Sequence, residues 1–284
     1  MERWVEETLH RGFRARLRAD RVLFDSQTEL QHLIIFETPD FGRVMMLDGV
    51  VQLSTKDEFV YHEMMAHVPL FAHGKAKKVL VVGGGDGGVL REVLRHPQVK
   101  SATLCEIDRS VIDLCRAHFP EISQGAYDDK RTRVVIADGT KFVAETKDRF
   151  DAILVDSTDP IGPGAVLFTK EFYTTCRRAL KPGGVLVTQN GLPFLQGPEL
   201  KESVGYFHAL FKDAYAYMAT TPSYFGDAMA YGWASDDKKL RRHSCKKLAK
   251  RHEKAGAFPT RYWNPEVQVA AFALPNYVRN LVEA

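Results

Sequence analysis

From residue 74 onward the chain repeats one pattern, an apolar run followed by a turn and a helical segment, and this repetition constrains the fold most. The runs are rich in β-branched residues and almost uninterrupted by polar ones, as expected for strands that are covered on both faces. Alternation of such strands with helices predicts a doubly wound, mostly parallel α/β sheet. The five runs lie in KKVLVVGGG (77–85), SATLCEID (101–108), TRVVIADG (132–139), FDAILVDSTD (150–159) and GGVLVTQNG (183–191).

The first 55 residues follow a different pattern. HLIIFET (32–38) and RVMMLDGVVQLS (43–54) are short apolar runs separated by turn signals, which favours antiparallel hairpins. The next stretch, KDEFVYHEMMAHVPLFAH, predicts a helix. We therefore expect a small N-terminal antiparallel β domain (1–55), a connecting helix (56–73) and a Rossmann-like catalytic domain of the methyltransferase type (74–284).

Composition limits the environment and the partners. No run of about 18 apolar residues is present, so we expect no membrane span. The opening MERWVEETLHRGF lacks the apolar segment of a secretory signal, and the four cysteines form no CxxC, so we expect reduced thiols and a cytoplasmic protein. A net charge of +3 is too small to indicate nucleic acid. The basic stretch 236–256 has no aromatic residue for base stacking, which favours a solvated helix face over a polyanion site.

The turn after the first of the five runs, GGGDGG (83–88), contains an acid in an unexpected place. Gly83, Gly85 and Gly88 fit the GxGxxG spacing that dinucleotide sites and adenosylmethionine sites share. Glycines let a ligand approach the backbone closely, but Asp86 would repel a phosphate there. Asp86 therefore indicates a ligand that carries positive charge near this turn.

Further acids stand where the next strands end, at the edge of the sheet where such folds bind ligands. Glu106 is placed to accept hydrogen bonds from two ribose hydroxyls, which supports a nucleoside but does not separate NAD from an adenosyl sulfonium. Asp138 and Gly139 follow the third strand, where adenosylmethionine-binding folds commonly place an acid that receives the adenine amino group. A surface turn is the alternative for Asp138.

The most informative acids are Asp156 and Asp159, three residues apart at the end of the fourth strand and directly before a proline-rich loop. A hydride-transferring enzyme has no obvious use for this pair. In a pocket for a polycation, the pair binds ammonium groups through charge-assisted hydrogen bonds. It also accepts a proton from an attacking amine.

These motifs occur in one order along the chain: LDGVVQ, DEFVYHEMMAHVPL, GGGDGG, EID, YDD, DG and DSTDPIGPG. Together they closely resemble the bacterial spermidine synthase family, and the resemblance runs from HLIIFE to AAFALPNY. The resemblance implies transfer of an aminopropyl group from decarboxylated S-adenosylmethionine to putrescine, giving spermidine and methylthioadenosine. It implies a homodimer or homotetramer, and it implies no metal, bound cofactor, nucleic acid or membrane.

The resemblance also assigns roles to residues of this chain. It makes Asp156 the base, helped by the hydroxyl of Tyr61. The donor is expected to contact Gln31, Leu47, Gln52, Gly83, Gly85, Asp86, Glu106, Asp138, Gly139 and Pro163. The acceptor is expected to contact His62, Asp86, Asp156, Asp159, Gln189 and Tyr224.

The chain departs from the family pattern in three places. The segment TPSYFGDAM has Ser223 and Asp227 where relatives usually show PTYxGG, and Phe13 stands where some relatives carry tryptophan. Asp227 either adds negative charge near the amine channel or faces solvent. His62 and His67 are five residues apart, which does not match the HExxH zinc pattern.

Three other functions share parts of this pattern. An adenosylmethionine-dependent amine N-methyltransferase would share the fold, and an NAD-dependent oxidoreductase would share the glycine turn, but Asp86 disfavours both. A polyamine-binding protein without activity would not need the pair Asp156 and Tyr61. Among aminopropyltransferases, a preference for cadaverine is the alternative to putrescine, because one methylene discriminates by only about 1–3 kcal/mol.

Overall fold

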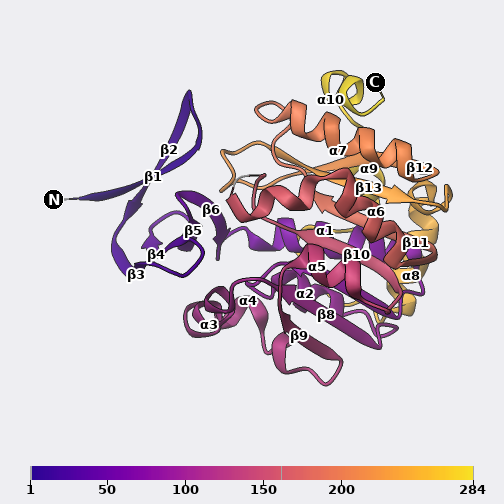
Figure 1. Ribbon diagram of the computed structural model, residues 1–284, viewed down its shortest axis with the longest axis horizontal. Coiled ribbons are helices and arrows are strands. Elements are labelled where there is room, and N and C mark those ends of the chain that lie inside the picture. The colour runs from indigo at the N-terminus through magenta and orange to yellow at the C-terminus, as the bar shows by residue number, and fades with distance from the viewer. Residues whose placement is uncertain (1, 161, 284) are drawn as a thin grey trace.

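The computed structural model describes residues 2–160 and 162–283. Its chain forms a small β unit and a large α/β unit joined by helix α1 (Glu58–His73), as Figure 1 shows. The expected architecture, a small antiparallel β unit ahead of a mostly parallel sheet with helices, is confirmed.

The N-terminal unit consists of a two-stranded hairpin and a four-stranded antiparallel sheet. The two strands of the last hairpin are joined by Asp48 and Gly49 alone, and both have positive φ, 46° and 77°. Such two-residue turns match the twist of the strands they connect. The bounds are β1 Arg3–His10, β2 Phe13–Ala19, β3 Arg21–Gln27, β4 His32–Thr38, β5 Gly42–Leu47 and β6 Val50–Ser54.

Helix α1 begins two residues later than the sequence pattern predicts. Asp57 precedes it but does not cap it, because its carboxylate accepts hydrogen bonds from Ser54 Oγ (2.8 Å) and from the backbone N–H of Ser223 (2.6 Å). The helix ends at Gly74, whose left-handed φ of 75° allows its N–H to bond Leu70 O. Asp57 thereby ties β6, α1 and the 221–227 loop together.

The large unit is built on a seven-stranded sheet in the order β12-β13-β11-β10-β7-β8-β9. The five strands from β11 to β9 are parallel, and β13 runs antiparallel to both β11 and β12. The pattern of apolar runs predicted the five parallel strands and did not single out β12 and β13. The bounds are β7 Lys78–Gly83, β8 Ser101–Glu106, β9 Thr132–Ile136, β10 Phe150–Asp156, β11 Leu180–Gln189, β12 Asp213–Thr220 and β13 Ala228–Ser235.

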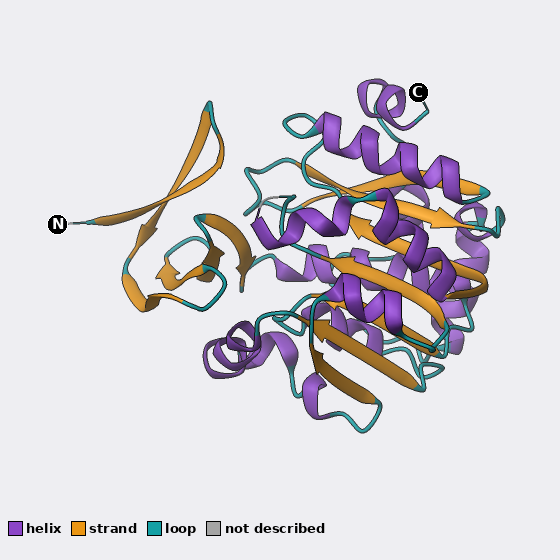
Figure 2. Cartoon of the chain, viewed as in Figure 1, coloured by secondary structure: helices purple, strands orange, loops and turns teal. Residues whose placement is uncertain are grey.

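Helices cover both faces of this sheet (Figure 2). Along β7, Val79 and Val81 pack into the cluster that contains α1, whereas Leu80 and Val82 pack into the opposite cluster, which contains α6 and α7. All four side chains are at most 1% exposed, which accounts for the unbroken apolar run. The helices are α2 Gly88–Leu94, α3 Arg109–His118, α4 Pro120–Ser123, α5 Gly139–Glu145, α6 Lys170–Ala179, α7 Gly197–Leu210, α8 Cys245–Lys254, α9 Pro265–Ala271 and α10 Asn276–Val282, with 3₁₀ turns η1 Ala126–Asp128, η2 Gly162–Phe168 and η3 Leu240–Arg242.

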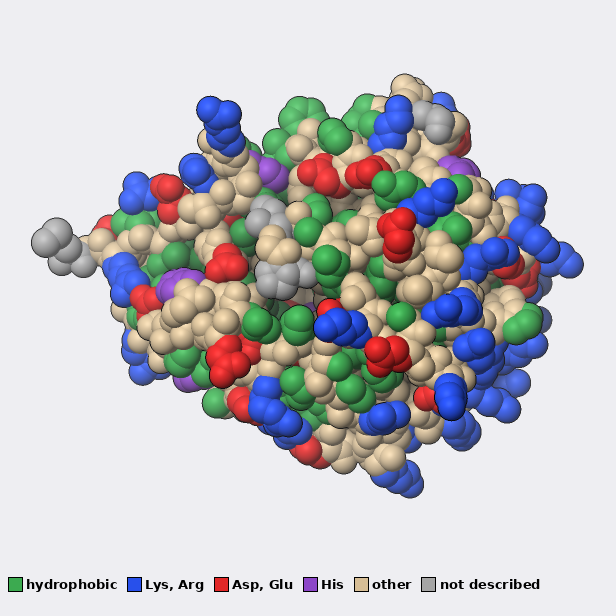
Figure 3. Space-filling model, viewed as in Figure 1, with side chains coloured by type: hydrophobic (Ala, Val, Ile, Leu, Met, Phe, Trp, Pro, Cys, Tyr) green, Lys and Arg blue, Asp and Glu red, His purple; other side chains and the backbone are tan. Residues whose placement is uncertain are grey.

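The basic stretch forms η3 and α8, away from the N-terminal unit. Leu240 and Leu248 are buried in the main core, whereas Lys246 and Lys247 are exposed. Lys and Arg side chains gather along the right-hand margin of Figure 3, on the side of the molecule where α8 lies. Within the described part of the chain, no helix is both long and apolar enough to cross a membrane.

Candidate active site

A cavity lies between the N-terminal unit and the carboxyl ends of β7, β8, β10 and β11. Its walls come from both units, because β1, β5 and β6 supply one side and the strand ends of the large sheet supply the other. Most of the residues expected at the site line this cavity: Gln31, Leu47, Gln52, Tyr61, Gly83, Gly85, Asp86, Glu106, Asp156, Asp159, Gln189 and Tyr224.

The glycine turn brings the backbone of β7 against that of β10. Gly83 has a φ of +78°, and a Cβ at this position would lie 2.0 Å from the carbonyl oxygen of Asp156. The N–H of Gly84 donates to that same oxygen at 2.9 Å. Only a residue without a side chain fits this approach, so the glycines here fix the position of Asp156 as well as opening the cavity floor.

Asp156 and Tyr61 meet at the cavity wall. The Tyr61 hydroxyl donates to Asp156 Oδ1 at 2.7 Å, while Asp156 Oδ2 is buried and has no hydrogen-bond partner among the described residues. Burial and the negative charge of Asp86 raise the pKa of Asp156 to about 7, against the opposing effects of His62 and Tyr61. Asp156 is therefore a carboxylate that can take up a proton near neutral pH.

Asp86, in contrast, is held in its ionised form. Its Oδ1 accepts the N–H of Gly88 at 2.6 Å and lies 3.4 Å from His62 Nε2. Burial alone would raise the pKa of Asp86, but His62 and the Gly88 N–H lower it below its usual value. Asp86 therefore stays ionised in the pH range where Asp156 titrates.

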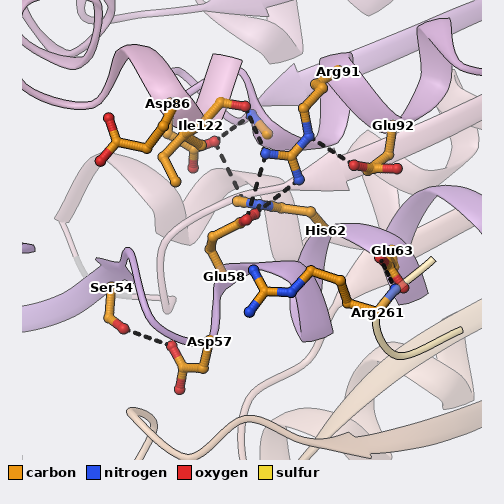
Figure 4. A network of polar contacts seen from close by, with 12 residues as sticks. Ser54, Asp57, Glu58, His62, Glu63, Asp86, Arg91, Glu92, Ile122 and Arg261 are labelled. Atoms are coloured by element: carbon orange, nitrogen blue, oxygen red, sulfur yellow. Dashed lines mark hydrogen bonds and ion pairs between the residues drawn. The ribbon is translucent and has the colours of Figure 1, made fainter. Parts of the chain in front are cut away.

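Figure 4 shows His62 in contact with Asp86 and Glu58, and His62 is not among the cavity-lining residues. Its Nδ1 is 2.6 Å from Glu58 Oε2, and the His62 side chain is 2% exposed. Burial lowers the pKa of His62, yet Asp86 and Glu58 raise it to about 10. His62 was expected to contact the acceptor; the structure places it against Asp86, and its contact with the acceptor stays a prediction.

Asp159 is anchored beside Asp156 by a glutamine that the sequence reading did not single out. Gln196 Nε2 donates to Asp159 Oδ1 at 2.6 Å, and Gln196 Oε1 accepts the N–H of Leu192 at 2.9 Å. Burial raises the pKa of Asp159, despite the hydrogen bond from Gln196. Close by in the lining, Gln189 has a buried Oε1 without a partner in the described chain.

Glu106 is the last residue of β8 and also lines the cavity. Its Oε1 accepts the N–H of Asp108 at 2.9 Å, and burial raises the pKa of Glu106 to about 7. Asp108 also accepts a hydrogen bond from Gln31 Nε2 at 3.0 Å, so a residue from the N-terminal unit is fixed beside Glu106.

Tyr224 connects the 221–227 loop to the N-terminal unit, because its hydroxyl donates to Gln52 O at 2.8 Å. The three departures from the family pattern lie in or next to this loop, and the first of them, Ser223, donates its backbone N–H to Asp57 at 2.6 Å. Asp227 is half-buried, accepts the N–H of Ala228 at 2.7 Å and is not among the cavity-lining residues. Phe13 is 48% exposed and packs on Phe225, which does line the cavity, with ring centroids 4.9 Å apart.

Two expected donor contacts, Asp138 and Gly139, are not among the cavity-lining residues. Asp138 caps helix α5 by accepting the N–H and the hydroxyl of Thr140 at 2.8 and 2.6 Å. Gly139 packs against Val82, since a Cβ there would lie 2.5 Å from its methyl group. The side chain of Pro163 lies outside the described part of the structure. The adenine contacts expected from these three residues stay predictions.

Sequence reading missed Glu7 and Leu9, which enter the cavity from β1. Glu7 is 3% exposed, and its Oε1 accepts the N–H of Val51 at 3.3 Å. Burial raises the pKa of Glu7 to about 8. The segment WVEETLH has no turn or glycine motif of its own, so no local signal marks it as part of a site. Across the described residues, no cluster of three or more metal-ligating side chains is found.

The fold and the cavity together define an α/β protein with an acidic binding site at the carboxyl edge of its sheet. Comparisons with known proteins agree with this description. Residues 58–244 match the model of the spermine/spermidine synthase domain, and residues 3–55 match that of the spermidine synthase tetramerisation domain.

Close relatives match over nearly the full length of the chain. The polyamine aminopropyltransferase of Pseudomonas syringae pv. tomato is 50% identical, with 98% of this chain and 96% of the relative covered. That of a Ruegeria species is 52% identical, with 99% and 98% covered. A solved spermidine synthase in complex with the transition-state analogue AdoDATO superposes with a TM-score of 0.92 at 39% identity, covering 100% of this chain and 97% of the other.

The Thermotoga maritima spermidine synthase superposes with a TM-score of 0.89 at 37% identity, covering 100% of this chain and 96% of that one. The chain therefore belongs to the spermidine synthase family of polyamine aminopropyltransferases. The match of its first strands to a tetramerisation domain supports an oligomeric enzyme.

Proposed function

We propose that this enzyme is a spermidine synthase, which transfers the aminopropyl group of decarboxylated S-adenosylmethionine to putrescine. The observation that carries the proposal is the pair of carboxylates in one cavity, Asp86 held ionised and Asp156 with a pKa of about 7. The first suits a substrate group that is cationic near neutral pH, and the second suits a proton acceptor.

The donor would lie along the strand ends. Glu106 would accept the ribose hydroxyls, with Gln31, Leu47 and Gln52 closing the site from the N-terminal unit. Asp86 would bind the propylammonium tail. Ordinary S-adenosylmethionine carries a carboxylate on that tail, which Asp86 would repel, so Asp86 favours the decarboxylated donor. Asp138, Gly139 and Pro163 are proposed to border the adenine.

The acceptor amine would enter between Asp156 and Asp159. Tyr61, Gln189 and Tyr224 supply polar atoms around this space, and His62 supports it from behind through Asp86. An acceptor amine must face the donor carbon for displacement, so alignment by these residues contributes to the rate.

The reaction would be a direct displacement. The amine nitrogen attacks the propyl carbon bound to sulfur, a C–N bond forms, and the C–S bond breaks with its electron pair going to sulfur. The leaving group is a neutral thioether, which needs no proton. An alkylammonium has a pKa of about 10, so a base must remove a proton from the attacking nitrogen. Asp156 takes that proton, with Tyr61 orienting its carboxylate.

Two alternative functions share parts of this site. An amine N-methyltransferase would use the same fold, but it gains nothing from an ionised acid beside the donor tail. Cadaverine is one methylene longer than putrescine, and one methylene is worth only about 1–3 kcal/mol of discrimination. We also propose that the enzyme is a homodimer or homotetramer built through residues 3–55, and that it is cytoplasmic. We propose domain boundaries at residues 55 and 73.

The test is product analysis with purified enzyme, decarboxylated S-adenosylmethionine and a panel of putrescine, cadaverine and spermidine. We expect spermidine and methylthioadenosine in equal amounts from putrescine, and slower reaction with the other amines. Faster reaction with cadaverine would change the acceptor but not the reaction. Absence of any aminopropylated product would contradict the proposal.

A further inference from the structure

A row of buried charged side chains leads away from the cavity into the body of the enzyme, and the proposed chemistry gives no role to its members beyond Asp86 and His62. Figure 4 shows the row: Asp86, His62 and Glu58, then Arg91 and Glu92 of helix α2. Successive contacts are 3.4 Å between Asp86 and His62, 2.6 Å between His62 and Glu58, and 2.9 Å between Glu58 and Arg91. These four side chains are only 12%, 2%, 7% and 10% exposed.

The imidazole of His62 faces a carboxylate at each nitrogen, Glu58 at Nδ1 and Asp86 at Nε2. A neutral imidazole carries one N–H and can donate to one of them, whereas an imidazolium donates to both. Both contacts are therefore satisfied only when His62 is positively charged.

The contact with His62 also fixes which oxygen of Asp86 meets a ligand. Oδ1 is taken by the N–H of Gly88 and faces His62 Nε2. Asp86 lines the cavity, so Oδ2 is the oxygen left for a bound cation. The orientation of Asp86 thus depends on a charged group that does not line the cavity.

Glu58 is itself held rigidly. Arg91 donates through one nitrogen to Glu58 Oε2, through Nε to Glu92 Oε1 at 2.7 Å, and through another nitrogen to Ile122 O at 2.7 Å. The guanidinium of Arg91 therefore connects α1, α2 and α4 and holds the carboxylate of Glu58 in one position.

We propose that Glu58 is a positioning residue for the cationic tail of the donor: it keeps His62 protonated, and His62 keeps Asp86 ionised with one oxygen turned to the cavity. This inference rests on the proposed function, because it takes Asp86 as the contact of the donor ammonium. Glu58 itself does not line the cavity and need not touch substrate.

The charges around His62 set the expected pH behaviour. Glu58 and Tyr61 face it from α1, Asp86 from the glycine turn, Arg91 from α2 and Asp156 from β10. With both carboxylates present the pKa of His62 is about 10. Loss of the Glu58 charge lowers it, so the variant loses the charged form of His62 at a lower pH than the wild type does.

The experiment compares Glu58→Gln with Glu63→Gln. Glu63 is the matched control: it lies on the same helix, is also buried, at 2% exposure, and accepts backbone N–H groups of residues 261–263 at 2.7–2.8 Å, away from His62. Calorimetry would measure the affinity of each variant for decarboxylated S-adenosylmethionine and for methylthioadenosine between pH 6.5 and 9.5. Methylthioadenosine has the nucleoside but lacks the aminopropyl tail.

For Glu58→Gln we expect decarboxylated S-adenosylmethionine to bind about 10- to 100-fold more weakly, the range for a lost hydrogen bond to a charged group. The affinity of Glu58→Gln for decarboxylated S-adenosylmethionine should also decline at a lower pH than that of the wild type. Its affinity for methylthioadenosine should stay within about twofold of the wild-type value by the same reasoning. Glu63→Gln should change neither affinity nor its pH dependence, whatever it does to thermal stability. If Glu58→Gln does not fold, His62→Gln takes its place and should show the same selective loss.

Two results would overturn the inference while leaving the proposed function intact. One is unchanged affinity and pH dependence for decarboxylated S-adenosylmethionine in Glu58→Gln. The other is an equal loss for both ligands, which would mean that the cavity as a whole is damaged. If the wild type itself does not bind the decarboxylated donor, the proposed function fails first and the inference with it.

Discussion

Replacing Tyr61 by phenylalanine should move the pH dependence of the enzyme upward. The Tyr61 hydroxyl gives Asp156 the one hydrogen bond found to its carboxylate among the described residues, at 2.7 Å. This bond stabilises the ionised carboxylate, so its loss raises the pKa of Asp156 above about 7. A hydrogen bond to a charged group is worth about 1.5–3 kcal/mol, and one pKa unit corresponds to about 1.4 kcal/mol, which predicts an increase of about 1–2 units.

At pH 7 the ionised fraction of Asp156 would fall from about one half to about 1–10%, an expected loss of about 5- to 50-fold in rate. At pH values above the new midpoint, most of the activity should return. The assay is methylthioadenosine release under limiting acceptor, with kcat/KM measured from pH 5.5 to 9.5. Ionisation of the substrate amine affects the wild type and the variant equally, so the difference between their profiles reports the enzyme group.

Tyr231 offers a control for this experiment. Its ring centroid lies 5.6 Å from that of Tyr61, and its buried hydroxyl has no partner among the described residues. Tyr231→Phe removes a neighbouring hydroxyl without touching Asp156, so the midpoint should stay near that of the wild type. A midpoint for Tyr61→Phe that is unchanged or shifted downward would refute the claim that Tyr61 tunes Asp156.

Three further substitutions test other parts of the site. Asp156→Asn should lower turnover by roughly 100-fold or more at every pH, as loss of a general base does; near-normal turnover in the same assay would place the base elsewhere. Asp86→Asn should lower kcat/KM for the decarboxylated donor by about 10- to 100-fold, and competition assays should show weaker discrimination against ordinary S-adenosylmethionine; unchanged discrimination would remove Asp86 from donor selection. Gly83→Ala should destabilise the protein by more than about 2 kcal/mol in urea unfolding, because a Cβ at φ +78° would lie 2.0 Å from Asp156 O; a stability equal to wild type would mean that the turn relaxes freely.

The parallel part of the fold could be predicted because each of its strands is buried on both faces. Val79 to Val82 alternate between the two cores, and every one of them had to be apolar. The hairpin of β1 and β2 could not be predicted in the same way. Its pattern of burial alternates weakly, with Trp4 46% exposed, and its charged residues give no apolar run to recognise.

The cavity-lining acids could be predicted because strand ends are local features of the sequence. Asp86, Glu106 and Asp156 each follow a buried strand, and the sheet topology brings them to one edge. Contacts between segments that lie far apart in the sequence could not be predicted from such local features. Glu7 enters the cavity from the first strand, and Gln196 reaches Asp159 across 37 residues of chain.

A motif also does not show whether a side chain binds a ligand, caps a helix or orients a neighbouring residue. Asp138 follows a strand as a ligand-binding acid would, and the structure shows it capping α5 through Thr140. His62 was grouped with the acceptor contacts on resemblance, and the structure shows both of its nitrogens facing carboxylates. These contacts could not be read from the motifs, and the ligand contacts expected of Asp138 and His62 stay predictions.

The most direct measurement is a competition between the two donors. The enzyme would be incubated with putrescine and equal concentrations of S-adenosylmethionine and decarboxylated S-adenosylmethionine, and the amines identified by mass spectrometry. The roles proposed for Asp86 and Asp156 predict spermidine as the product, formed together with methylthioadenosine and with little N-methylputrescine. A methylated amine as the main product, with no spermidine, would contradict the account.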